Sequence, residues 1–180
     1  MRKVLLYIAA SLDGYIARSN GDTSWLHDES FALKGEDFGY SDFISTIDTT
    51  LMGNKTYQVV LGFDMPFPYS DKKNYVFCRS AAKQQDTESI QFVREDAIAF
   101  VRNLKFQQGQ DIWLIGGSQI NTLLLNAGLI DEIILTITPT ILGTGIPLFA
   151  AGAEEQNLKV LDSKSYKNGF TQARYKCQKI

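Results

Sequence analysis

The stretch from Asp111 to Ile120, Asp-Ile-Trp-Leu-Ile-Gly-Gly-Ser-Gln-Ile, places a strand and a helix next to each other with two glycines between them. Residues 111–115 are short and apolar enough to predict a strand that is covered on both faces. The pattern of Ser118–Asn126 predicts a helix directly after it. Such a junction is typical of α/β folds, in which ligands bind at the carboxyl ends of the strands.

The turn between this strand and this helix could hold a phosphate group. Gly116 and Gly117 have no side chain that would keep a ligand from the backbone, and the free N–H groups of a helix N-terminus attract anions. Ser118 could cap the helix or donate its hydroxyl to the ligand. Ile115 and Gln119 flank the turn and are candidate cofactor contacts as well. A tight turn packed against a neighbour is the alternative interpretation of this segment alone.

A second junction of the same kind lies earlier in the chain. An apolar strand over residues 49–52 stops at Gly53, and the predicted helix Asn54–Leu61 then carries Lys55 and Thr56 in its first turn. A lysine opposes the helix dipole at that end, so an anionic ligand would remove the conflict. A lysine that is simply solvated is the alternative.

A third candidate follows the predicted strand over residues 75–78, where Arg79 and Ser80 stand at the carboxyl end. An arginine and a hydroxyl at such a position suit an isolated phosphate. Three strand ends that carry glycine, cationic or hydroxyl groups together indicate one extended ligand with several phosphates.

The rest of the chain also alternates strands with helices before it changes character near the C-terminus. Residues 18–39 have no clear period, which is typical of a functional loop or lid, and residues 139–147 are predicted to form a loop. Asn168 and Gly169 separate two extended runs and predict a hairpin, because both residues tolerate positive φ. We therefore predict one three-layer α/β domain over residues 1–180, with a mixed, mostly parallel central sheet, flanking helices and a C-terminal antiparallel hairpin. The other predicted strands are residues 4–10, 15–17, 90–93 and 132–138, and the other predicted helices are residues 42–47 and 95–106.

The composition excludes several classes of function. The 18 Lys and Arg residues nearly balance the 20 Asp and Glu residues, and the formal net charge of -2 predicts neither a nucleic-acid nor a membrane partner. One histidine, His27, and two separated cysteines, Cys78 and Cys177, predict no metal site and no disulfide framework. No apolar run approaches the roughly 18 residues of a membrane span. These features predict a cytoplasmic protein.

Four motifs that together span nearly the whole chain resemble the dihydrofolate reductase-like superfamily, in particular the C-terminal reductase domain of the bifunctional riboflavin-biosynthesis deaminase–reductase. The first motif is Ala-Ala-Ser-Leu-Asp-Gly-Tyr-Ile-Ala at residues 9–17, and the second is Met-Gly-Asn-Lys-Thr-Tyr at residues 52–57. The third is Ile-Gly-Gly-Ser at residues 115–118. The fourth begins with Gly-Leu-Ile-Asp-Glu at residues 128–132 and continues through residues 139–149.

The resemblance implies a reductase that binds NADPH and is commonly a homodimer. Relatives place the phosphates of the cofactor at turns that match residues 53–56, residues 79–80 and residues 116–118. In relatives the nicotinamide lies near the first strand, and the matching residues in this chain are Ala9, Ala10 and Ile16.

The chain departs from the family pattern at several places. Asn54 stands where reductases of this superfamily often carry arginine, which leaves Lys55 and Arg79 to neutralise a ribose 2′-phosphate. Residues 62–70 lack the pyrimidine-binding pattern of the riboflavin enzymes, and no carboxylate clearly matches the helix carboxylate of the folate enzyme. The zinc signature of the deaminase domain cannot be assembled from one histidine and two separated cysteines.

A hydride transfer from nicotinamide also requires a proton for the substrate. Asp13, in the loop after the first strand, is the leading candidate for substrate binding or proton delivery, with a turn residue as the alternative. Asp28 and Asp37 in the 18–39 loop are further candidate acids, and ordinary exposed carboxylates are the alternative. Trp25 could cover the nicotinamide or the substrate or else anchor the loop, and Thr144 could approach the substrate.

These residues predict an NADPH-dependent reductase of a small heterocyclic or ribosylamino-pyrimidine substrate. Reduction of another carbonyl or imine is the alternative within the enzyme class. A non-catalytic nucleotide-binding module is the alternative outside it, because no residue is unambiguously the proton donor. A structural dimerisation domain is a further alternative, and it would have an empty cleft at the glycine turns.

Overall fold

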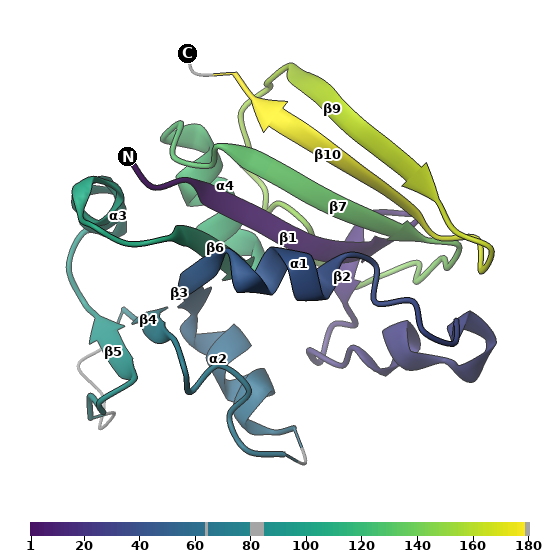
Figure 1. Cartoon of the computed structure of the whole chain (residues 1–180), viewed down its shortest axis with the longest axis horizontal. Coiled ribbons are helices and arrows are strands. Elements are labelled where there is room, and N and C mark those ends of the chain that lie inside the picture. Colours follow the sequence, from purple (N-terminus) through teal and green to yellow (C-terminus); the bar gives the residue numbers. More distant parts are fainter. Residues whose placement is uncertain (64, 80–84, 179–180) are drawn as a thin grey trace.

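The computed structural model describes residues 1–63, 65–79 and 85–178, and its centre is an eight-stranded sheet in the order β5-β4-β3-β6-β1-β7-β10-β9 (Figure 1). A separate two-stranded sheet pairs β2 with β8. The strands are β1 (Val4–Ser11), β2 (Tyr15–Ala17), β3 (Ile47–Gly53), β4 (Lys73–Phe77), β5 (Ile90–Val93), β6 (Asp111–Gly116), β7 (Glu132–Thr138), β8 (Ile146–Pro147), β9 (Leu158–Ser165) and β10 (Thr171–Cys177). The helices are α1 (Tyr40–Ser45), α2 (Asn54–Leu61), α3 (Ala97–Phe106) and α4 (Ser118–Asn126).

The predicted α/β class is confirmed, because the strands from β5 to β7 in this order are all parallel. Strand β1 lies in the middle, where Leu6 is aligned with Leu114 of β6 on one side and with Ile133 of β7 on the other. Its apolar run follows from this position, since a central strand is covered on both faces.

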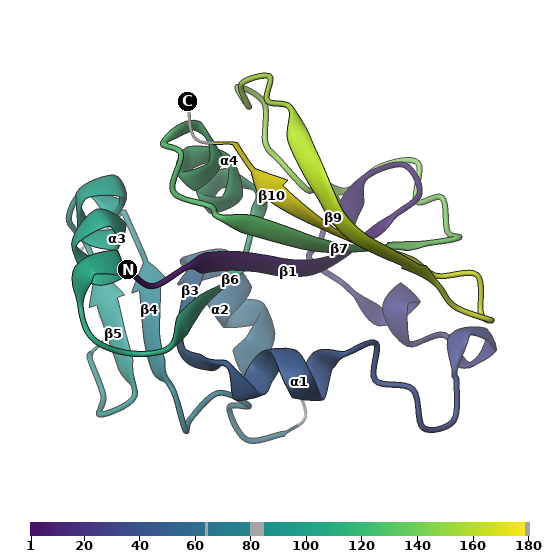
Figure 2. The same cartoon turned by 45° about the horizontal axis from the view of Figure 1, so that its top comes forward.

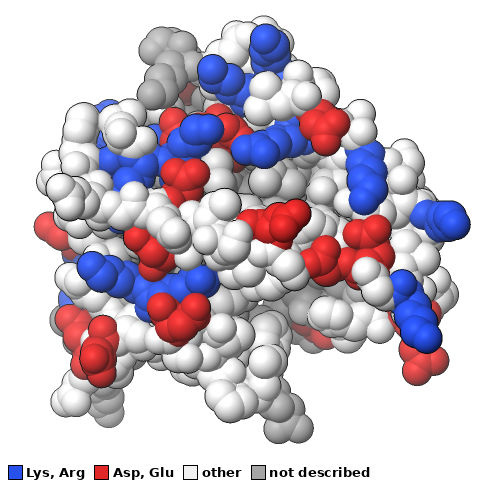
Figure 3. Space-filling model, in the orientation of Figure 1, with Lys and Arg blue, Asp and Glu red and all other residues white. Residues whose placement is uncertain are grey.

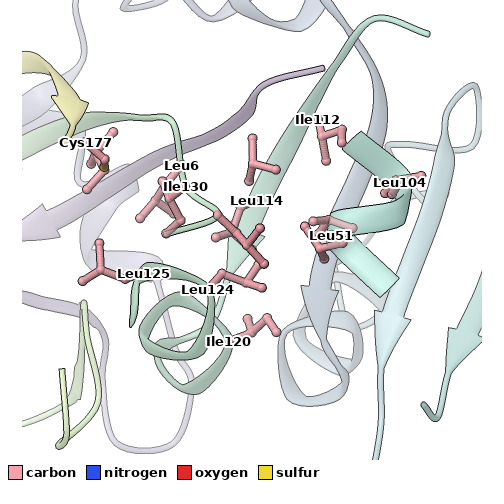
Figure 4. Packing of buried hydrophobic residues seen from close by; sticks show 14 residues of the cluster. Leu6, Leu51, Leu104, Ile112, Leu114, Ile120, Leu124, Leu125, Ile130 and Cys177 are labelled. Atoms are coloured by element: carbon pink, nitrogen blue, oxygen red, sulfur yellow. The ribbon is translucent and has the colours of Figure 1, made fainter. Parts of the chain in front are cut away.

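Alternate side chains of strand β6 pack against different helices. Ile112 and Leu114 of β6 belong to the core under α3 and α4, together with Leu104 and Leu124 (Figure 4). Trp113 points to the opposite face and packs near α1. Figure 2 shows α4 above strand β1 and α1 below it, so the sheet is the middle layer of three.

The predicted C-terminal hairpin is confirmed. Strand β10 pairs antiparallel with β7, where Thr171 is aligned with Ile137, and β9 adds to its other side as the edge strand. The turn between β9 and β10 contains Gly169 at φ +86, a value that favours glycine. This turn therefore lies at the carboxyl end of β7.

The predicted helix and strand bounds agree with the structure within two residues, and the differences have local causes. The helix predicted at residues 42–47 begins earlier, at Tyr40, because Gly39 adopts a left-handed conformation at its N-cap, and it gives way to β3 at Ile47. The segment predicted as a loop over residues 139–147 contains the short strand β8. The irregular 18–39 segment contains the 3-10 turns η1 (Ser24–His27) and η2 (Glu29–Phe31).

Charges of both signs are interspersed over the face drawn in Figure 3. No helix within the described residues combines the length and the apolarity needed to cross a bilayer.

Candidate functional site

The three predicted junctions lie side by side at the carboxyl edge of the sheet. Strand β3 pairs in parallel with both β4 and β6, and Gly53 is aligned with Phe77 while Met52 is aligned with Gly116. A Cβ atom built on Gly53 would lie 4.0 Å from the carbonyl oxygen of Gly116. We call the surface formed by residues 53–56, 79 and 116–119 the glycine trough.

A side chain in place of Gly116 or Gly117 would come into close contact with neighbouring residues. A Cβ atom on Gly117 would lie 3.1 Å from Oγ1 of Thr56, which lies in the first turn of the neighbouring helix α2. Gly116 has φ +114, and a Cβ atom there would lie 3.2 Å from Oδ1 of Asn121. These close contacts explain why both positions are glycine, since a side chain would crowd the neighbouring atoms, and Gly117 is only half-buried, so part of its surface stays accessible to a ligand.

Helices α2 and α4 both begin in the trough without a side-chain cap. Their N-cap residues are Gly53 and Gly117, which have no side chain that could cap the first backbone N–H groups. The hydroxyl of Ser118 is buried and has no hydrogen-bond partner within the described chain. Helix N-terminal N–H groups with an uncommitted hydroxyl beside them suit an anionic group, so the phosphates of a dinucleotide fit this place.

A cavity of about 650 Å³ continues from the trough between α3 and α4. It shares Arg79 and Gln119 with the trough, and the Nη2 of Arg79 donates to Oε1 of Gln119 over 3.1 Å. The cavity also adds residues that the sequence motifs did not identify, among them Ile98, Arg102 and Leu123. No local pattern marks Arg102, because it is one charged residue among others on the exposed side of a helix.

Three of the predicted cofactor contacts are not among the described residues that line the cavity. Lys55 is exposed in the first turn of α2 and does not line the cavity. Ser80 lies outside the described residues. The half-buried Ile115 instead packs against the side chains on the α1 and α2 face of the sheet.

The residues predicted near the nicotinamide meet at the carboxyl end of β1. Ala9 is half-buried, whereas Ala10 is fully buried, so only Ala9 presents part of its side chain. Ile16 is half-buried in β2, and β2 pairs with β8. A Cβ atom on Gly145 would overlap the carbonyl oxygen of Ala17, and this close packing holds the β8 segment against β2.

Asp13 fastens a loop in the structure. Its Oδ1 accepts hydrogen bonds from Oγ of Ser11 over 2.6 Å and from N of Leu142 over 3.1 Å, and its Oδ2 accepts one from N of Gly143 over 2.7 Å. The hydrogen bond from Ser11, followed by those from the two backbone N–H groups, lowers the pKa of Asp13. Near neutral pH Asp13 is therefore a carboxylate that holds residues 142–143, and this opposes the prediction that it delivers a proton.

The other two candidate acids have similar local roles. Asp28 accepts from both the hydroxyl and the backbone N–H of Ser30, and these bonds lower its pKa. Asp37 accepts from the backbone N–H groups of Gly39 and Ser41, and the hydrogen bonds from Ser41 lower its pKa most. Both carboxylates are exposed, and both are poor proton donors near neutral pH.

Trp25 and Thr144 occupy very different environments. Trp25 is buried in η1, and its Nε1 has no hydrogen-bond partner within the described chain. Thr144 is exposed between Gly143 and Gly145. His27 is exposed as well, and Cys177 is buried, which raises the pKa of its thiol to about 11.

The 18–39 loop is fastened to the C-terminal hairpin by contacts that the sequence did not predict. Phe38 has φ +58, and its carbonyl oxygen accepts from the hydroxyl of Tyr7 and from Nε2 of Gln172, each over 3.1 Å. Nδ2 of Asn168 donates to the carbonyl oxygen of Phe31 over 2.8 Å. These partners are far apart in the sequence, so no local motif could have identified them.

Among the described residues, no group of three or more His, Cys, Asp or Glu side chains is placed to hold a metal ion.

Comparisons with known proteins agree with this geometry. The chain matches the family of RibD C-terminal domains over residues 2–171. It is 42% identical over 165 residues to the uncharacterized protein YwjB of Bacillus subtilis (strain 168), a match that covers 92% of each chain.

Two solved structures have the same fold. A putative riboflavin biosynthesis protein from Shewanella sp. PV-4 superposes with a TM-score of 0.84 at 30% identity, and the match covers 99% of each chain. A Thermotoga maritima diaminohydroxyphosphoribosylaminopyrimidine deaminase/5-amino-6-(5-phosphoribosylamino)uracil reductase superposes with a TM-score of 0.72 at 17% identity, over 98% of this chain and 57% of that one. The strand order, the glycine trough and the match over residues 2–171 lead to one conclusion: the chain belongs to the RibD C-terminal domain family, within the dihydrofolate reductase-like superfamily.

Proposed function

We propose that the protein is an NADPH-dependent reductase that transfers a hydride to a small heterocyclic or ribosylamino-pyrimidine substrate. The observation that carries this proposal is the glycine trough, in which two helix N-termini without side-chain caps meet at one sheet edge. Reductases are also found among the structural neighbours, as the name of the Thermotoga protein states.

Residues of the trough would hold the phosphates of the cofactor. The backbone at Gly117 and the hydroxyl of Ser118 would donate to the diphosphate, and the positive ends of α2 and α4 would stabilise its charge. When bound, NADPH supplies the hydride. Ala9 and Ile16 would flank its nicotinamide at the end of β1, at the positions that match the nicotinamide contacts of relatives.

The remaining tasks are to exclude water from the hydride and to supply a proton. The 18–39 loop begins directly after β2 and carries the buried Trp25, so it is suited to cover the reacting groups. Because Asp13, Asp28 and Asp37 are all held as carboxylates, we assign the proton to water.

Calorimetry with NADPH and NADH, followed by an oxidation assay at 340 nm with a panel of substrates, tests this function. The panel contains 5-amino-6-(5-phosphoribosylamino)uracil, dihydrofolate and simple carbonyl and imine compounds. We expect saturable binding of NADPH, weaker binding of NADH, and NADPH oxidation with one class of substrate. If neither NADPH nor NADH binds, the proposal is refuted.

A nucleotide-binding module without turnover is the second candidate. It is favoured by the local hydrogen bonds that occupy all three candidate acids. NADPH binding without oxidation across the whole panel would support this module over the reductase.

We also propose that the protein is a cytoplasmic homodimer. The edge strand β9 exposes Leu158, Val160 and Leu161, with exposed fractions of 37%, 58% and 44%. Exposed apolar side chains on an edge strand favour pairing with a second copy. Light scattering should give twice the mass of one chain, and a Val160→Lys variant should give the mass of a monomer; a wild-type monomer would contradict the dimer.

A further inference from the structure

The cavity between α3 and α4 contains an unusual pair of charges. Arg79 follows strand β4, Arg102 lies in the second turn of α3, and they are the charged members of the cavity lining within the described residues. No carboxylate is among the described residues of this lining. Two guanidinium groups that line one cavity favour a bound anion, because an anion there can pair with both positive charges.

Three other arginines of the chain form ion pairs with carboxylates. Arg2 pairs with Asp48, Arg18 with Asp22, and Arg174 with Glu132. Within the described residues, by contrast, neither Arg79 nor Arg102 forms an ion pair. The side-chain amide of Gln119 accepts from Arg79 but carries no charge to neutralise it.

The cavity also has the walls that a base and a ribose require. Ile98 and Leu123 provide apolar surface, and Gln119 connects the cavity with the trough, since it belongs to the lining of one and to the helix start of the other. A dinucleotide whose diphosphate lies on the trough would therefore extend its adenosine into this cavity. Lys55 is outside the lining, although its sequence position suggested a phosphate contact.

We infer that Arg102, together with Arg79, binds a phosphate monoester on the adenosine end of the cofactor and thereby sets a preference for NADPH over NADH. This inference rests on the proposed function. Arg102 is a specificity-determining residue in this arrangement, and Lys55 contributes to the diphosphate region without distinguishing the two cofactors.

Calorimetry with NADPH, NADH, 2′,5′-ADP and 5′-AMP on wild type, Arg102→Gln, Arg102→Lys and Lys55→Gln tests the assignment. Lys167→Gln is the matched control, because Lys167 is an exposed cation in the hairpin turn, away from the cavity. Glutamine is a good helix former, so the Arg102 variant should keep α3. Circular dichroism and thermal unfolding verify that each variant is folded.

We expect Arg102→Gln to weaken NADPH and 2′,5′-ADP by about 10- to 100-fold and to change NADH and 5′-AMP by less than about two-fold. Arg102→Lys should recover part of the loss, and Lys55→Gln should affect NADPH and NADH equally. Equal losses for both dinucleotides in Arg102→Gln, unchanged NADPH affinity, or a selective loss in Lys55→Gln would overturn the assignment while the proposed function stands. A wild-type protein that binds neither dinucleotide would instead overturn the proposed function, and the assignment with it.

Discussion

Replacing Gly117 by alanine separates the fold of the trough from its capacity to hold a ligand. Gly117 has φ -84 and ψ -168, which alanine adopts without strain. The added methyl would lie 3.1 Å from Oγ1 of Thr56, a side-chain atom that can move by a few tenths of an ångström. Crowding and the reduced freedom of the unfolded chain oppose each other, so the free energy of unfolding should fall by no more than about 1 kcal/mol.

The same methyl would occupy space that we propose for the diphosphate beside the Gly117 backbone. The loss of two charge-assisted hydrogen bonds corresponds to about 100-fold weaker binding or more. Thermal unfolding should therefore show a Tm lower by at most about 4 °C for a chain of this size, while calorimetry shows NADPH binding nearly abolished. The double variant Gly117→Ala/Thr56→Ala should recover the Tm and leave binding lost. Wild-type NADPH affinity in Gly117→Ala would refute the role of the trough.

A control for Gly117→Ala is available in the same protein. Gly62 ends helix α2 with φ -80, and a Cβ atom there would lie 3.3 Å from the carbonyl oxygen of Val59. Gly62→Ala therefore adds a methyl in similarly close contact, but outside the trough. It should leave NADPH affinity unchanged, and a loss equal to that of Gly117→Ala would mean that crowding alone explains both.

Three further changes test the surroundings of the trough. The pKa of Asp13 is lower in the folded protein than in the unfolded chain, where it is about 4. Its hydrogen bonds therefore stabilise the fold above the pKa of the unfolded chain, and this stabilisation is lost as the pH falls through the pKa of the folded protein. The Tm difference between wild type and Asp13→Asn should accordingly be constant near neutral pH and shrink in acid; a difference independent of pH would contradict this sign. Gln172→Leu removes a donor to the carbonyl of Phe38 and should speed trypsin cleavage at Lys34 in the 18–39 loop without weakening NADPH, whereas an unchanged cleavage rate would mean that this bond does not hold the loop. Glu132 is buried and bonded to two cations, so Glu132→Gln should lower the unfolding free energy by about 1–3 kcal/mol, measured by urea titration, and no change would show that the pairs contribute nothing net.

The sequence predicts the trough well because its signals are local. A short apolar run, a glycine and an amphipathic helix follow one another at both Gly53 and Gly117, and parallel pairing of the strands then brings the turns to one edge. The predicted start of α1 differs from the observed one by two residues because the left-handed conformation of Gly39 sets the first turn.

Contacts between residues far apart in the sequence could not be predicted from local patterns. The sequence is compatible with Asp13 as a turn residue or as a proton donor. Only the hydrogen bonds that it accepts from Leu142 and Gly143 distinguish these two roles. Arg102 and Gln172 have no motif because their importance depends on neighbours that lie far away along the chain. Local pattern therefore predicts the candidate site, whereas the residues proposed to define its specificity and to cover it are found only through the three-dimensional contacts.

A crystal structure of the protein grown with NADPH measures the ligand position directly. The diphosphate should lie within hydrogen-bond distance of the Gly117–Ser118 backbone and next to Thr56, with the adenosine between α3 and α4. Density for the diphosphate on another face of the molecule, with the trough filled only by water, would contradict the assignment of this sheet edge as the dinucleotide site.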